Sequence, residues 1–248
     1  MHYLTLARLT LGIAFLCFSL NVLGQNNDQP FTSIETANET DRTRDLPDEP
    51  PVNWKLRRGA WELGIEAGFA PLQPTFFSGE KEYATEGRKF GSVSIHAGRV
   101  IGTKGPITYE YLFEAIPFAL AIKNEVTNPA FISEEQTPEI APTVRENTYA
   151  WGVMPAGFRF IFRPEKRLKP YARVGAGFVF SSKPIPIPQS PTYNFAGDFG
   201  GGVMYSVNKK QVISFGYRYF HISNMNIGEI NPGYNANVVY VGYSWFSK

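Results

Sequence analysis

Residues 61–69 decide the fold of this chain, because they read Trp-Glu-Leu-Gly-Ile-Glu-Ala-Gly-Phe. Apolar residues occupy the odd positions, and glutamate or glycine occupies the even ones. Successive side chains of a β-strand point to opposite faces, so this period of two predicts a strand with one apolar and one polar face. Residues 107–114, Ile-Thr-Tyr-Glu-Tyr-Leu-Phe-Glu, repeat the pattern.

The same alternation predicts eight strands, most of them long enough to cross a bilayer at a tilt. They are expected at residues 60–70, 90–101, 106–120, 149–163, 170–181, 194–206, 212–223 and 235–246. Short and long connections alternate between them, as periplasmic turns and outer loops do in outer-membrane barrels. We therefore predict an all-β fold, an eight-stranded antiparallel transmembrane β-barrel, with the 224–234 loop on the outer rim.

A soluble β-barrel or sandwich would also alternate, but its apolar face would point inward. The aromatic content of the apolar face favours the membrane, because Tyr243 and Trp245 suit an interfacial girdle. Aromatic residues make up 15% of the chain, with 20 Phe and 13 Tyr. The formal net charge of +2 gives no case for nucleic-acid binding, which needs a concentrated basic patch.

The N-terminal region predicts export. Arg8 precedes an apolar run, and Val22 and Gly24 suit a cleavage site after the run. A membrane anchor is the alternative, although the run is short for a span of about 20 residues. The single cysteine, Cys17, lies in this run, so we expect a mature chain without disulfides. We predict three parts: a signal peptide (1–24), a flexible polar lead-in (25–58) and the outer-membrane barrel (59–248).

A histidine and a serine share one face of the strand expected at 212–223. His221 and Ser223 have the parity of Phe215 and Tyr217, so all four are predicted to face lipid. Residues two apart on a strand have Cα atoms about 6.5–7 Å apart, so the imidazole can reach the hydroxyl. Such a pair makes an activated nucleophile for an acyl carbonyl, and Asn224 could supply an oxyanion donor. By itself, His-x-Ser on a strand is a weak signal of catalysis, because polar residues of this kind also occur at the membrane interface.

The segment 220–224, Phe-His-Ile-Ser-Asn, followed by 231–235, Asn-Pro-Gly-Tyr-Asn, resembles the PagL-like lipid A 3-O-deacylase (acyloxyacyl hydrolase) family. The resemblance implies an outer-membrane serine esterase that removes a 3-O-linked acyl chain from lipid A of lipopolysaccharide. It also implies roles for three residues: His221 as general base and acid, Ser223 as nucleophile and Asn224 as oxyanion donor.

One position departs from the family pattern. The third member of the family's triad is a glutamate, in the region where this chain has Asn235. By parity Asn235 faces the same surface as His221, and its carbonyl can orient the imidazole Nδ1–H, as asparagine does in Cys-His-Asn sites. It cannot supply negative charge to the imidazolium. Glu229 is a second candidate, and the sequence leaves the choice open.

The resemblance implies no cofactor, and three histidines without a cysteine pair give no zinc spacing. The expected partners are lipid A and the surrounding lipid of the outer membrane. A homodimer is left open. The alternative function is a non-catalytic structural outer-membrane barrel that retains the motif but lacks an effective acid.

Overall fold

The computed structural model describes residues 54–71, 88–128, 143–227, 231 and 233–247. The chain divides into two units, Met1–Glu49 and Pro50–Lys248, and the barrel lies in the second. Within the described ranges, no helix is long and apolar enough to cross a membrane. The predicted signal peptide, most of the predicted lead-in and Glu229 lie outside the described residues.

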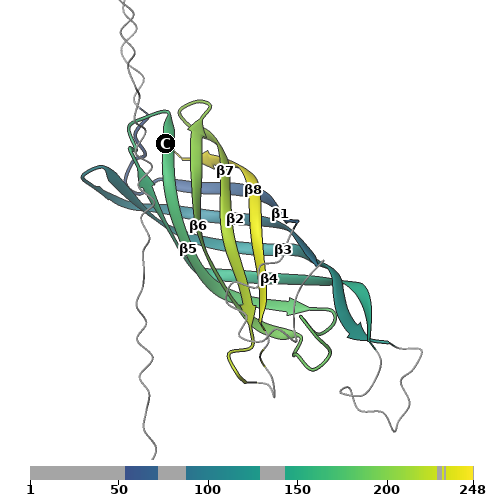
Figure 1. Ribbon diagram of the computed structural model, residues 1–248. Helices are drawn as coiled ribbons and strands as arrows, with labels where there is room; N and C mark the ends of the chain where they lie inside the picture. Colours follow the sequence, from purple (N-terminus) through teal and green to yellow (C-terminus); the bar gives the residue numbers. More distant parts are fainter. Residues whose placement is uncertain (1–53, 72–87, 129–142, 228–230, 232, 248) are drawn as a thin grey trace, which may run out of the picture. The chain divides into compact units, whose positions relative to one another are not determined.

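Eight strands form one closed barrel in which each strand pairs antiparallel with the next and β1 pairs with β8 (Figure 1). The strands are β1 (Trp61–Ala70), β2 (Lys89–Lys104), β3 (Ile107–Thr127), β4 (Thr143–Phe162), β5 (Leu168–Ser181), β6 (Tyr193–Ser206), β7 (Gln211–Ser223) and β8 (Tyr234–Phe246). The predicted fold class is therefore confirmed.

The main difference from the sequence prediction lies in β3 and β4. They pair as far as Thr127 and Thr143 and project beyond their neighbours (Figure 1). This extension carries polar and charged residues such as Asn124, Glu125 and Arg145. Its side chains therefore lack the regular apolar alternation on which the sequence prediction depends.

The two ends of the barrel differ in their connections. The short-turn rim consists of residues 54–60, 105–106, 163–167, 207–210 and 247. The opposite end, the long-loop rim, carries the connections that follow β1, β3, β5 and β7. The chain enters β1 and leaves β8 at the short-turn rim. In outer-membrane barrels, short turns face the periplasm.

The two faces of the wall settle the choice between a membrane barrel and a soluble one. The apolar face points outward: Trp61 is 55% exposed and Phe215 is 62% exposed. The glutamates of the alternating segments point inward, and Glu62 and Glu114 are each only 2% exposed. An apolar exterior around a polar interior is the arrangement of a membrane barrel.

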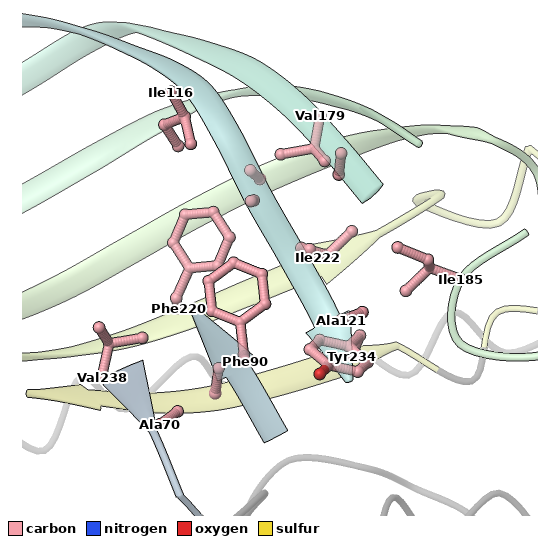
Figure 2. Packing of buried hydrophobic residues seen from close by; sticks show 14 of the residues in the cluster. Ala70, Phe90, Ile116, Ala121, Val179, Ile185, Phe220, Ile222, Tyr234 and Val238 are labelled. Carbon is pink, nitrogen blue, oxygen red and sulfur yellow. The ribbon is translucent and has the colours of Figure 1, made fainter. Parts of the chain in front are cut away.

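An apolar cluster fills the barrel near the long-loop rim. The rings of Phe90 and Phe220 stack with centroids 5.5 Å apart, and Tyr234 and Ile222 lie beside them (Figure 2). A second apolar cluster, which includes Leu56 and Phe246, fills the end near the short-turn rim. An eight-stranded barrel has an interior just wide enough for side chains, so these clusters occupy the lumen.

Charged side chains lie between the two clusters and form what we call the ionic layer. Arg218 Nη1 lies 2.7 Å from Glu114 Oε1, and Arg173 Nη2 lies 2.6 Å from Glu114 Oε2. His96 Nε2 lies 3.2 Å from Glu62 Oε1. A Cβ at Gly64 would come within 2.4 Å of the His96 ring, so a larger residue there would have to displace the ring. The layer consists of Glu62, Glu66, His96, Glu110, Glu114, Arg159, Arg173, Asp198 and Arg218.

Candidate active site

Pairing between β7 and β8 places His221 directly opposite Asn235. Directly opposed residues of an antiparallel pair share a face, so the parity prediction for Asn235 is confirmed. His221 Nδ1–H donates to Asn235 Oδ1 at 2.5 Å. Gly233 has a φ of 67°, and a Cβ there would lie 3.1 Å from His221 Cε1. Glycine therefore lets the loop approach the imidazole in a left-handed backbone conformation.

Ser223 is the last residue of β7 and lies on the same outer face, two residues beyond His221. Its Oγ lies 2.9 Å from Asn231 Nδ2 and 3.1 Å from Asn231 Oδ1. The hydroxyl oxygen also accepts the Met225 backbone N–H at 3.0 Å. Among the hydrogen bonds of the described residues, none joins Ser223 to His221. The two side chains are therefore neighbours that are held by separate partners.

Asn224 lies in the turn just beyond β7 and is 3% exposed. Its Oδ1 accepts the Asn226 backbone N–H at 2.9 Å, an Asx turn in which the side chain stabilises its own loop. Its backbone N–H donates to Asn231 Oδ1 at 3.1 Å. The oxygen of the Asn224 amide is thus engaged in the turn, and Nδ2 is the donor group of this side chain.

Sequence reasoning missed the part played by Asn231. Its amide contacts both the Ser223 hydroxyl and the Asn224 backbone, so it links the start and the end of the loop that follows β7. The only local signal is the Asn-Pro-Gly run at 231–233, which predicts a turn. The alternation of residues along a strand does not predict which loop side chain folds back to contact that strand.

A shallow groove runs along the outer wall beside His221. On β6, Gly197 is the direct partner of His221, and it leaves open space where a larger side chain would stand. The groove has a volume of about 320 Å³. It is lined mainly by apolar groups, from Val174, Gly175, Gly197, Asp198, Phe199, Tyr219 and His221.

Small residues continue this strip across the next strands. Gly197 pairs with Ala176 on β5, and Ala176 pairs with Ala156 on β4. A second hollow of about 270 Å³ lies here, with Phe178 and Phe195 among its lining residues. Because adjacent strands lie about 4.8 Å apart, the strip from His221 to Ala156 crosses three strand spacings, roughly 14 Å.

The described residues contain no group of three or more His, Cys, Asp or Glu side chains that could hold a metal ion. The polar groups around His221 and Ser223 are amides, a hydroxyl and backbone N–H groups. The chemistry available at this place is therefore proton transfer and nucleophilic attack at the lipid-facing wall.

A protein-family model described as lipid A 3-O-deacylase (PagL) matches residues 128–244. The match includes His221, Ser223, Asn224 and Asn235. No curated protein matches the chain.

Several solved outer-membrane barrels have a similar arrangement of strands. The outer membrane enzyme PagL has 13% identity and a TM-score of 0.42, with 74% of this chain and 97% of that chain covered. Neisserial surface protein A has 15% identity and a TM-score of 0.43, with 75% and 96% covered. The attachment invasion locus protein Ail of Yersinia pestis has 11% identity and a TM-score of 0.40, with 77% and 100% covered.

The family match begins just after β3 and ends within β8. The strands that it covers belong to a closed barrel with an apolar outer wall. The match over residues 128–244 confirms the resemblance to the PagL lipid A 3-O-deacylase family that the sequence predicts, and the chain is an outer-membrane β-barrel.

Proposed function

We propose that this barrel is a serine esterase that removes a 3-O-linked acyl chain from lipid A of lipopolysaccharide. The observation that carries the proposal is the 2.5 Å hydrogen bond from His221 Nδ1 to Asn235 Oδ1. This bond fixes the tautomer that leaves Nε2 unprotonated, which is the form of histidine that can accept a proton from serine. The pair lies on the outer wall, where a lipid ester can approach from the side.

The proposed reaction has two halves. Ser223 Oγ attacks the ester carbonyl carbon while His221 Nε2 takes the hydroxyl proton, and the protonated histidine then returns that proton to the leaving sugar oxygen. The ester carbon–oxygen bond breaks and an acyl-serine remains. Water, activated by His221, attacks the acyl-serine, which releases the fatty acid and restores the Ser223 hydroxyl.

Ser223 must change partner before it can react. In the resting arrangement its Oγ is held by Asn231 and by the Met225 N–H. Rotation about one side-chain torsion, χ1, moves a serine hydroxyl from one staggered position to another. We infer that substrate entry moves the hydroxyl from Asn231 towards His221 Nε2, and that Asn231 serves as a positioning residue for the resting state.

The developing oxyanion needs donors close to Ser223. The amide nitrogen of Asn224 follows the serine directly, and its Oδ1 is anchored to Asn226 N–H at 2.9 Å. An amide held in this way is a preorganised donor, and such a donor is typically worth about 10²–10³ in kcat. Asn235 orients the imidazole, but its neutral amide supplies no negative charge to stabilise the imidazolium that forms during the reaction.

The groove beside His221 supports a lipid substrate. Its walls are apolar, and its volume of about 320 Å³ lies next to the imidazole. An acyl chain placed there would keep its ester end near Ser223 while its methylene groups contact Phe199, Tyr219 and Val174. Large side chains elsewhere on the outer wall would displace such a chain from the barrel surface.

Mass spectrometry of lipid A tests the proposal. Cells that make the wild-type chain should lose a 3-O-linked acyl chain from their lipid A, and cells that make Ser223→Ala at equal outer-membrane abundance should not. Ser190→Ala is a matched control, because Ser190 is a buried serine in the connection between β5 and β6. Acyl loss that persists in Ser223→Ala would overturn the serine mechanism.

The alternative is a non-catalytic structural barrel. Two observations favour it: Asn235 stands where a carboxylate would act, and Ser223 is bonded to Asn231 in place of His221. Wild-type protein that is folded and inserted yet leaves every acyl chain of lipid A in place would support this alternative.

A further inference from the structure

Charge is distributed very unevenly around the short-turn rim. Its described residues include eight exposed lysines and arginines, against a single exposed acid, Glu165. The net charge of the whole chain is only +2, so the composition does not reveal this concentration. Carboxylates of the barrel are largely buried in the ionic layer, where they face arginines. The rim is therefore strongly basic although the chain is nearly neutral.

Five of these cations surround two adjoining hollows. The entering segment contributes Lys55, Arg57 and Arg58, and the β6–β7 turn contributes Lys209 and Lys210. The hollows have volumes of about 350 Å³ and 470 Å³ and share Lys55, Leu56, Arg57 and Lys209. No Asp or Glu among the described residues lines either of them.

The apolar floor of these hollows fixes the cations in place. Leu56 and Ala60 are 8% and 4% exposed, and they pack with Phe246 in the apolar cluster that closes this end of the barrel. The segment that carries Lys55, Arg57 and Arg58 is thus docked on the barrel. Like charges that are held together repel one another, so the cluster gains from a bound anion.

Aromatic residues place this rim at the depth of lipid headgroups. Trp61 and Tyr205 are outward-facing and exposed, as interfacial aromatic residues are. The Arg99 guanidinium lies 4.5 Å from the centre of the Trp61 ring, and the Arg167 guanidinium lies 4.6 Å from the centre of the Tyr205 ring. These contacts hold positive charge at the membrane surface on the side of the short turns.

We propose that the cleft between residues 54–60 and the 207–210 turn binds the phosphate headgroup of an anionic phospholipid in the periplasmic leaflet. Basic pockets at a membrane surface bind multiply charged lipid headgroups, and each Lys or Arg adds to the attraction. A headgroup phosphate would enter between Arg57 and Lys209, and the acyl chains would follow the outer wall past Trp245 or Trp61. The site is independent of the proposed esterase, because it lies at the opposite rim from His221.

Native mass spectrometry of the full chain tests this site. The purified protein is taken from bilayers of phosphatidylethanolamine mixed with phosphatidylglycerol or cardiolipin, and the retained lipids are counted. We expect the wild type to retain the anionic lipid preferentially. The double variant Lys209→Gln/Lys210→Gln should weaken retention on the order of tenfold to thirtyfold, because each lysine contributes to the attraction of the headgroup. Both lysines are exposed residues of the turn between β6 and β7.

The matched control is Lys89→Gln/Lys123→Gln, which removes two exposed lysines from the long-loop side of the barrel. This variant should retain anionic lipid like the wild type. Three results would overturn the proposal: no preference of the wild type for anionic over zwitterionic lipid, equal losses in the two double variants, or displacement of the lipid by a soluble peptidoglycan fragment at comparable concentration.

Discussion

The two histidines of the barrel wall occupy opposite environments. His96 points inward, is 2% exposed, and lies 3.2 Å from a Glu62 carboxylate oxygen in the ionic layer. His221 points outward, is half-buried, and donates to the neutral Asn235 amide at 2.5 Å. The inner histidine has charge around it but no access for a substrate. The outer one has access but no charge.

This contrast separates the groups that hold the barrel from those that we assign to chemistry. A closed eight-stranded barrel must fill its lumen with side chains, and polar ones there need partners. The ionic layer meets that need with arginine–carboxylate contacts of 2.6–3.2 Å. Polar groups on the lipid side serve no such purpose and are costly there, which points to function. Each prediction below tests one side of this contrast.

The largest expected effect comes from His221→Gln. Loss of the general base should lower the rate of acyl release by about 10⁴-fold or more, since a serine hydroxyl without a base is a weak nucleophile. The rate is measured as fatty acid released from lipid A by purified protein in detergent. His96→Gln is the control, and it should destabilise the barrel while leaving the rate per folded molecule unchanged. Equal losses of rate in both variants would contradict the assignment of catalysis to His221 and of a structural role to His96.

Arg218→Met tests the inner side. The change removes a guanidinium that lies 2.7 Å from a Glu114 carboxylate oxygen and 3.2 Å from an Asp198 carboxylate oxygen. Removing one member of a buried ion pair typically costs about 3–5 kcal/mol, so the urea midpoint of unfolding in detergent should fall markedly. Arg163→Met, at an exposed turn arginine, should change stability by less than about 1 kcal/mol. A barrel that tolerates both changes equally would show that the ionic layer does not stabilise it.

Asn235→Asp asks what charge would do on the outer side. Aspartate has the size of asparagine, so a carboxylate oxygen should remain near His221 Nδ1 and stabilise the imidazolium. We expect acyl release to rise about tenfold to hundredfold, part of the roughly 10⁴ that separates acid from amide in a serine protease. Asn237→Asp puts the same charge two residues away on the same face and should leave the rate unchanged. A fall in rate for Asn235→Asp in folded protein would contradict the proposed role.

The smallest expected effect concerns the groove. A Cβ at Gly197 meets only the Gly175 carbonyl oxygen at 3.8 Å, so Gly197→Leu should fold and fill the space beside His221. We expect kcat/KM for long-chain esters to fall about tenfold, which is roughly the effect of losing the burial of one or two methylene groups. For short-chain esters we expect little change. Gly91→Leu is the control, because Gly91 also faces outward but lies on β2. A uniform loss for both chain lengths would exclude an acyl-binding groove.

The sequence predicted those features that depend on local periodicity. Alternation located all eight strands and placed His221, Ser223 and Asn235 on one face, because a strand has a fixed period of two. It could not predict the ends of β3 and β4, which extend beyond the neighbouring strands and lose the apolar pattern. A net charge of +2 also concealed the basic short-turn rim.

Contacts across the chain could not be predicted in the same way. The role of Asn231 depends on how a loop folds back to Ser223, and the groove depends on Gly197, Ala176 and Ala156 being aligned across three strands. Such alignment follows from strand register, which shifts at bulges such as the one near Pro155. The hydrogen bond of Ser223 to Asn231, in place of His221, is likewise a property of the folded loop.

Covalent trapping of Ser223 is the most direct test of the central claim, that the outer polar site is a serine esterase. The folded protein is treated with a long-chain alkyl fluorophosphonate, and its peptides are analysed by mass spectrometry. We predict one adduct, on the peptide that contains Ser223, and none in His221→Gln. An unmodified Ser223 in folded wild-type protein would contradict the claim, whether or not another residue carries the label.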